Sequence, residues 1–311
     1  MSPTLPQGPE YFSPEDEGNN IAVWDVKSGQ LLRTFPTSLF ESEDPSVKKQ
    51  MQWPALKWSA DDKYVARVTP GQQISVYELP SMGLHDKKSL KIEGVVDFEW
   101  CPHGDKDRDE SEKAAKADKP LKKARENMLA YWTPEVANQP ARVTLLEFPS
   151  RRILRQKNLF NVTEVGVLTH QIEHRYSMDF CQCKLYWQNH GDFLCVKVDR
   201  HTKTKKSIFC NLEIFRVREK DFPVEVVELK GRFAFPGHSL VLTGHLDTVT
   251  DFSWEPKGER FAIVSSSDPN LGNPGPGITI KTDISFYQLD RTKNDFRLLR
   301  THHSVVCLRH C

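Results

Sequence analysis

Four side chains within one short segment are of the types that zinc binds. They follow an H-x3-H and then a C-x-C spacing, at His170, His174, Cys181 and Cys183. A structural zinc site needs such nitrogen and sulfur donors to converge in a tetrahedron. Two cysteines only one residue apart are tightly spaced for a single closed site, and the surrounding segment has no regular pattern. The sequence therefore predicts no metal site here.

The chain also lacks the spacings of common catalytic centres. No Gly-x-Ser-x-Gly elbow occurs, and no cysteine has a histidine at a motif spacing. Cys195 and Cys210 fall within strand patterns and are expected in a core. The glycines of Gly272–Gly277 are interleaved with prolines, which lack the backbone N–H groups that a phosphate cradle needs. We expect no enzyme, no cofactor and no small-molecule substrate.

Two basic segments could instead contact RNA phosphates. One ends the charged run Asp105–Glu126, which holds seven acidic and eight basic residues, and the other begins at Arg200. Lysine and arginine give a nucleic acid backbone salt-dependent affinity that does not depend on base sequence. The alternative is that both segments are solvated loops. The candidate contacts to ribosomal RNA are Lys119, Lys122, Lys123, Arg125, Lys203, Lys205 and Lys206.

The chain as a whole has little net charge, although these two segments are basic. Its 311 residues carry a formal charge of +1, and the mean hydropathy is -0.56. No apolar run approaches the roughly 18 residues of a membrane span, and the N-terminus lacks the basic start and apolar stretch of a signal peptide. Seven cysteines without a framework spacing fit a reducing compartment. A cytoplasmic protein without a membrane partner is expected.

The elements that would position these residues form a repeat. A short strand containing a tryptophan, a polar turn and an apolar strand recur at intervals of 42, 87 and 67 residues. Setting aside the 22 residues of Asp105–Glu126 and the 18 of Val165–Gln182 brings the second interval to 47. Setting aside the 16 of Gly231–Leu246 brings the third to 51. These values approach the roughly 40–45 residues of a propeller blade. The tryptophans are Trp58, Trp100, Trp187 and Trp254.

A shorter unit precedes these four. Ile21–Phe35 contains a Trp24-Asp25 pair and a Ser-Gly turn, and we expect Asp25 to accept hydrogen bonds within that turn. The tryptophans are expected to be buried between sheets. The sequence thus predicts an all-β fold: a partial WD40-type β-propeller of about four four-stranded blades and a half blade. Residues 1–18 would be an extended leader, 19–300 the propeller and 301–311 an irregular tail.

Several of these stretches resemble one known family. NNIAVWDVKSGQLLRTF, MLAYWTPEVANQPARVTLLEFPSRRILRQKNLFNV and DFSWEPKGERFAIV are similar to the WD-type propeller in the B subunit of eukaryotic translation initiation factor 3. The resemblance implies a cytoplasmic, non-enzymatic scaffold that helps to assemble the preinitiation complex on the small ribosomal subunit and to recruit mRNA. Its implied partners are the other subunits of the factor, the small ribosomal subunit with its RNA, and mRNA through the complex. The alternative is a generic WD-repeat interaction module outside translation.

The chain also departs from that family's pattern. It has no RNA-recognition-type domain and fewer blades than the propeller of that family. The segments 165–182 and 231–246 also interrupt stretches of sequence that are nearly continuous in the family. Both segments are expected to be irregular, and one interpretation is that they are translated short introns. An incomplete ring would leave apolar faces uncovered, so we expect this chain alone to be marginally stable.

Overall fold

The computed structural model describes residues 20–36, 54–102, 126–136, 139–159, 178–202, 208–227, 248–266, 280–290 and 295–306. Its chain divides into two compact units. The first comprises Met1–Trp58 with Asp62–Glu93, and the second comprises Ser59–Asp61 with Gly94–Cys311.

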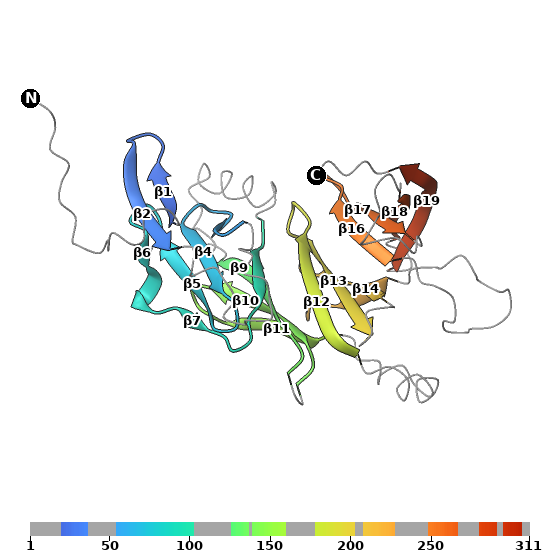
Figure 1. Ribbon diagram of the computed structural model, residues 1–311, viewed down its shortest axis with the longest axis horizontal. Helices are drawn as coiled ribbons and strands as arrows, with labels where there is room; N and C mark the ends of the chain where they lie inside the picture. Colours follow the sequence, from blue (N-terminus) through green and yellow to red (C-terminus); the bar gives the residue numbers. More distant parts are fainter. Residues whose placement is uncertain are drawn as a thin grey trace, which may run out of the picture. The chain divides into compact units, whose positions relative to one another are not determined.

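The first unit contains a half blade and one blade-like sheet. The half blade is an antiparallel pair, β1 (Asn20–Asp25) and β2 (Gln30–Pro36). The sheet has the order β3-β4-β5-β6, with one further short strand, β7, paired to β5 (Figure 1). Its strands are β3 (Lys57–Trp58), β4 (Tyr64–Thr69), β5 (Gln73–Glu78), β6 (Gly83–Leu84) and β7 (Leu90–Lys91).

A cluster of apolar side chains joins the half blade to this sheet. Phe35 of β2 is 2% exposed, and its ring lies edge-on to that of Tyr77 with centroids 5.2 Å apart. The Arg33 guanidinium lies 4.6 Å from the centroid of the Tyr77 ring and donates to the carbonyl of Met82 at 2.6 Å. A cation over an aromatic face is stabilising, so this contact reinforces the apolar packing.

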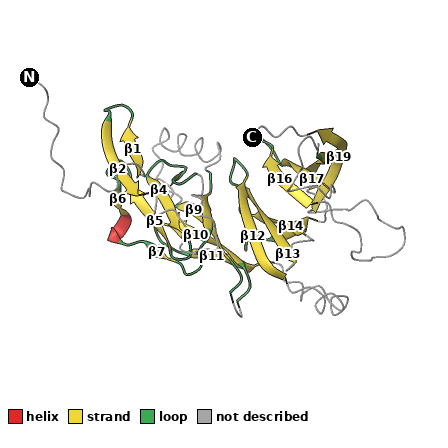
Figure 2. Ribbon diagram, in the orientation of Figure 1, coloured by secondary structure: helices red, strands yellow, loops and turns green. Residues whose placement is uncertain are grey.

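The second unit consists of three four-stranded antiparallel sheets, each following the chain order of its strands (Figures 1 and 2). The first comprises β8 (Asp97–Trp100), β9 (Asn127–Thr133), β10 (Arg142–Phe148) and β11 (Ile153–Asn158). The second comprises β12 (Met178–Trp187), β13 (Phe193–Thr202), β14 (Ile208–Arg216) and β15 (Val224–Val227). The third comprises β16 (Thr248–Trp254), β17 (Arg260–Ser266), β18 (Lys281–Asp290) and β19 (Asp295–Val306).

The middle sheet of this unit is buried on both faces. Leu194 and Val196 of β13 belong to a core shared with the β8–β11 sheet, whereas Cys195 between them belongs to a core shared with the β16–β19 sheet. Successive residues of a strand point to opposite faces, so an uninterrupted apolar run is what a twice-covered strand requires. Four blade-like sheets and a half blade confirm the predicted fold class, a partial propeller.

Each repeat tryptophan lies on the first strand of its sheet, as predicted, but their burial differs. Trp100 and Trp254 are 6% and 9% exposed, and Trp187 is half-buried. The expectation of burial is wrong for Trp58, which is 46% exposed, and for Trp24, which is 56% exposed. Trp24 pairs across the hairpin with Leu31, itself 42% exposed, on the face opposite Phe35.

Trp58 differs from Trp187 and Trp254 in the sheet that precedes it in the chain, which is a half blade within the described residues. In the second unit, the indoles of Trp187 and Trp254 donate to the first strand of the preceding sheet. The sheet that precedes β3 has only β1 and β2 among the described residues, so no such strand is described there to receive Trp58.

Two boundaries drawn from the sequence are also wrong. Residues 301–306 are not an irregular tail, because β19 continues through them and pairs with β18 as far as Val306 opposite Lys281. Residues 178–182 are not irregular either, because they begin β12 and pair with β13. Backbone hydrogen bonds between strands form whether or not apolar and polar side chains alternate. These extensions of β12 and β19 therefore have no strand pattern in the sequence. The expected leader 1–18 and the segments 165–177 and 231–246 lie outside the described part of the chain.

The β1–β2 turn has the bracing predicted from Asp25. Its carboxylate accepts hydrogen bonds from the Ser28 hydroxyl at 2.6 Å and from the Lys27 N–H at 3.1 Å. Gly29 completes the turn at a φ of 68°, a conformation that glycine adopts without strain. The Ser28 bond, and then the Lys27 bond, hold the pKa of Asp25 below its ordinary value of 3.8.

We predict that Ser28→Ala raises the pKa of Asp25 toward 3.8, because it removes the largest cause of the shift. A carboxylate whose pKa is lowered by folding contributes stability above its unfolded pKa and loses it as the pH falls through the lowered value. Carboxyl chemical shifts followed by NMR from neutral to acidic pH would measure both variants. Equal titration of Asp25 with and without the Ser28 hydroxyl would contradict this assignment.

Candidate interaction surface

Successive sheets of the second unit are joined by their tryptophans. The Trp187 indole N–H donates to the carbonyl of Glu99 at 3.3 Å, and that of Trp254 donates to the carbonyl of Tyr186 at 2.9 Å. In both cases the acceptor is the residue just before the tryptophan of the preceding sheet. The same contact, repeated, fixes the first strand of each sheet against the next.

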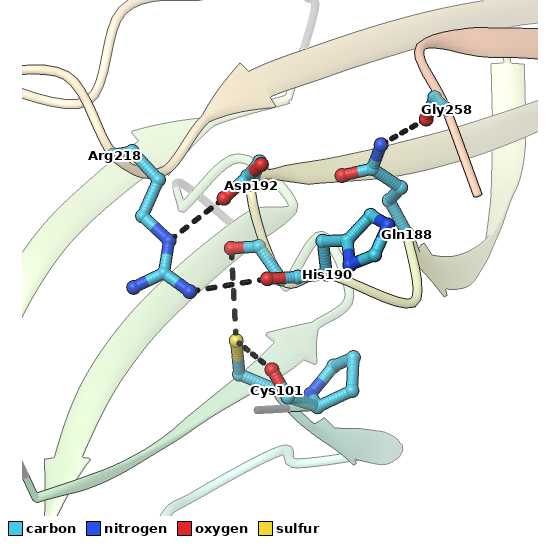
Figure 3. Close-up of polar contacts among 8 residues, drawn as sticks. Cys101, Gln188, His190, Asp192, Arg218 and Gly258 are labelled. Atoms are coloured by element: carbon cyan, nitrogen blue, oxygen red, sulfur yellow. Dashed lines mark hydrogen bonds and ion pairs between the residues drawn. The ribbon is translucent and has the colours of Figure 1, made fainter. Parts of the chain in front are cut away.

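The turns that follow these tryptophans are also linked from sheet to sheet. The Gln188 side-chain amide donates to the carbonyl of Gly258 (Figure 3). The side-chain amide of Asn189 donates to the carbonyl of Pro256 at 3.3 Å. On the other side, the Cys101 thiol lies 3.9 Å from the carbonyl of Gly191. Cys101 and Pro102 of the first sheet, the turn 188–192 of the second and the turn 255–259 of the third are therefore linked, and we call these residues the turn face.

An arginine from a different connection holds the central turn. Arg218, just after β14, donates from Nε to the Asp192 carboxylate at 2.9 Å and from Nη2 to the carbonyl of His190 at 3.1 Å (Figure 3). The Val217 N–H donates to the carbonyl of Asp192 at 2.9 Å. The turn 188–192 is thus held by its own sheet as well as by both neighbours.

Gly191 is the tightest point of the turn face. Its φ is 67°, and a Cβ at this position would lie 2.5 Å from the carbonyl oxygen of Pro102 and 2.8 Å from Sγ of Cys101. A backbone carbonyl cannot swing aside as a side chain can. Only glycine meets both requirements, the left-handed backbone and the close approach of the neighbouring sheet.

We predict that Gly191→Ala lowers the free energy of unfolding by about 2 kcal/mol, because a left-handed conformation alone costs a residue with a Cβ about 1–2 kcal/mol. Gly258→Ala is the matched control in the next turn. There the obstacle is the flexible side chain of Glu255, and the loss should be smaller. Urea unfolding followed by circular dichroism would compare the two, and equal losses would contradict the special role of Gly191.

A pocket of about 290 Å³ opens on the turn face between the β8–β11 and β12–β15 sheets. Met128, Leu154, Val217 and Phe222 provide its apolar lining, and all four are continuous with the core between these sheets. Charged residues also line it. They are Glu126, Glu147, Arg152 and Arg218.

Each charge at the pocket has a protein partner. Arg152 contacts Oε2 of Glu147 through both Nε, at 2.9 Å, and Nη2, at 2.7 Å. Glu126 accepts a hydrogen bond from the Ser150 N–H at 3.0 Å. The side chain of Arg152 is 67% exposed while that of Glu147 is 22% exposed, so the Arg152 guanidinium is more accessible to solvent than the Glu147 carboxylate that it contacts.

The structure describes none of the candidate RNA contacts themselves, since Lys119, Lys122, Lys123, Arg125, Lys203, Lys205 and Lys206 all lie outside the described residues. In the sequence, the first group falls between β8 and β9, and the second falls between β13 and β14.

The cysteines are placed in the interior, as expected for Cys195 and Cys210, which are 0% and 7% exposed. Burial raises the pKa of both thiols above the ordinary value of 9.0, so both stay protonated and weakly reactive at neutral pH. Cys183 is buried in the core facing the β8–β11 sheet, while His170 and His174 lie outside the described residues. Within the described residues, no group of three or more acidic, histidine or cysteine side chains could hold a metal ion.

Sequence reasoning did not single out Gly191, Asp192, Arg152 or Arg218. A signal existed for the turn, because His-Gly-Asp occurs both at 103–105 and at 190–192, each shortly after a repeat tryptophan. No comparable signal marks the arginines, which reach the pocket from other connections. The described residues include no helix long and apolar enough to cross a membrane.

Three curated relatives match nearly the whole chain, and each is named as the B subunit of eukaryotic translation initiation factor 3. That of Mycosarcoma maydis is 60% identical over 295 residues, covering 95% of this chain and 34% of the relative. That of Cryptococcus neoformans is 49% identical over 290 residues, covering 92% and 33%. That of Schizosaccharomyces pombe is 47% identical over 299 residues, covering 95% and 34%. The chain therefore spans about a third of the length of these relatives.

Two further comparisons are less extensive. The family model described as "Eukaryotic translation initiation factor eIF2A" matches residues 176–271. A solved structure described as "Crystal structure of the eukaryotic initiation factor" covers 92% of this chain and 59% of its own, at 14% identity and a TM-score of 0.42. That similarity is too low to add to the argument.

Repeated four-stranded sheets, two of them bonded to the preceding sheet by the tryptophan of their first strand, define this chain as a partial WD-type β-propeller. Its sequence shows to which propeller protein it is similar. The chain is homologous to about a third of the B subunit of eukaryotic translation initiation factor 3, and the resemblance inferred from its strands is confirmed.

Proposed function

We propose that this chain is part of a non-enzymatic scaffold subunit of initiation factor 3. In this role it would help to assemble the preinitiation complex on the small ribosomal subunit and to recruit mRNA in the cytoplasm. The observation that carries the proposal is the 60% identity to the Mycosarcoma maydis relative across 295 residues. The other subunits of the factor, the small ribosomal subunit with its RNA, and mRNA through the complex are the proposed partners.

The geometry supports a scaffold in two ways. Side-chain bonds to backbone carbonyls fix the first strands of the three sheets to one another, and likewise the turns 188–192 and 255–259, so their surface is preorganised. A preorganised surface loses little conformational entropy on binding. The buried thiols are protonated at neutral pH, which suits packing and not nucleophilic chemistry.

Basic side chains would provide the proposed RNA contacts, at low specificity. The two groups belong to different connections of the chain, 119–125 between β8 and β9 and 203–206 between β13 and β14, so both of them or only one of them would contact RNA. Neutralising each group separately by lysine-to-glutamine changes, and measuring the salt dependence of ribosomal RNA binding, would distinguish these cases.

Affinity purification of the tagged chain from cells, followed by mass spectrometry, tests the proposal. The expected result is enrichment of the other initiation factor 3 subunits over an unrelated propeller of similar size. Enrichment of proteins unconnected with translation, without those subunits, would overturn the proposal and favour a generic WD-repeat module.

A further inference from the structure

We propose that the pocket on the turn face binds a partner segment in which an apolar side chain lies beside acidic residues. The inference rests on the proposed scaffold function only in assuming that the chain has a protein partner. The apolar lining, the position of Arg152 and the rigidity of the surrounding turns carry it.

The lining defines an anchor site for one side chain. Met128 and Leu154 come from the first sheet, and Val217 and Phe222 come from the β14–β15 region of the second. The volume of about 290 Å³ is near the lower end of the roughly 300–1,000 Å³ of ligand pockets. Interfaces draw most of their affinity from a few apolar anchors seated in such pockets and surrounded by a polar rim.

Arg152 selects acidic groups next to that anchor. Its contacts with Glu147 use Nε and Nη2, both directed to a single carboxylate oxygen. A guanidinium has five N–H donors, two of them on Nη1, so donors remain on a side chain that is 67% exposed. An incoming carboxylate would gain charge-assisted hydrogen bonds there. A basic neighbour of the anchor would meet the guanidinium as a like charge, and the two carboxylates at the pocket, Glu126 and Glu147, already accept hydrogen bonds from the Ser150 N–H and from Arg152.

The surrounding structure keeps the pocket open. Arg218, on the second sheet, is tied to Asp192 and to the carbonyl of His190. Gly191 lets the turn approach Pro102 of the first sheet. Because the turn 188–192 and Arg218 are held in this way, binding requires little rearrangement of that wall.

Fluorescence anisotropy of labelled hexapeptides with the full 311-residue chain tests the proposal. The peptide DELFED should bind saturably, KKLFKK should bind at least about tenfold more weakly, and DEAAED, which lacks the apolar anchor, should lose binding. Arg152→Gln should weaken DELFED binding by about tenfold or more, the fold-change that the loss of a charged hydrogen bond produces. Circular dichroism would confirm that each variant is folded.

Arg155→Gln is the matched control. Arg155 is exposed on β11, three residues after Arg152, and does not line the pocket. This change should leave DELFED binding within about twofold, as expected for a surface charge outside the site. Absence of saturable DELFED binding, equal binding of KKLFKK, or equal effects of the two arginine variants would each overturn the proposal. These outcomes leave the test of the scaffold function unaffected, because that test measures association with whole subunits.

Discussion

Trp254→Ala should lower the free energy of unfolding by about 3–5 kcal/mol, the range for truncating a buried tryptophan to alanine. Trp254 is 9% exposed and lies at the centre of an aromatic cluster. Its ring centroid is 5.8 Å from that of Phe193, 5.2 Å from that of Phe252 and 5.4 Å from that of Phe261. The change would also remove the indole donor from the carbonyl of Tyr186.

Urea unfolding of the full chain, followed by circular dichroism, measures this loss. Trp24→Ala is the control, because Trp24 occupies a similar sequence phrase but is 56% exposed. A surface change of that kind should alter stability by less than about 0.5 kcal/mol. Comparable losses in the two variants would mean that the repeat phrase, and not the packing between sheets, determines the contribution of a tryptophan.

Lys157→Met should cost about 3 kcal/mol, because it removes a cationic partner from a buried carboxylate. Lys157 of β11 lies 3.3 Å from Oε2 of Glu213 on β14, so this ion pair joins two neighbouring sheets. The Glu213 side chain is fully buried, and that of Lys157 is 28% exposed. The expected loss of stability is at the lower end of the range for breaking a buried ion pair, because the Lys157 side chain keeps some contact with solvent.

The double variant Lys157→Met with Glu213→Leu separates charge from shape. Replacing both members of a buried pair by apolar residues is often neutral, so the double variant should recover most of the stability lost in the single one. The same urea unfolding compares both variants with the unchanged chain. A double variant that is less stable than the single one would show that Glu213 is needed for contacts other than this pair.

The period of the repeat and the position of each tryptophan could be predicted from the sequence, because both depend on local patterns. A tryptophan near the end of a short apolar strand, followed by a polar turn, marks the first strand of all four sheets. The role of Asp25 was equally local, since its hydrogen bonds reach only two and three residues along the chain. The strand positions of the tryptophans and the turn around Asp25 can therefore be predicted from residues close to them in the sequence.

Burial and the pocket could not be predicted in the same way, because they depend on which sheet lies next to which. Trp58 and Trp254 occupy equivalent positions on the first strands of their sheets, yet one is exposed and the other buried, and the sheets described before them in the chain differ. The pocket brings together residues from Cys101 to Phe222, which lie on two sheets and several connections. The continuation of β19 through residue 306 depends on a partner strand, β18, and leaves no alternation in the sequence.

We propose that this chain is part of a translation initiation scaffold built from propeller blades. This role requires the chain to co-sediment with initiation complexes. Sedimentation of formaldehyde-treated cell extract through a sucrose gradient, with the tagged chain detected in each fraction, tests this most directly. We predict a substantial share of the chain in the fractions that hold the small ribosomal subunit and the other initiation factor 3 subunits. Recovery of the folded chain only in the light fractions, apart from those components, would contradict the proposed role.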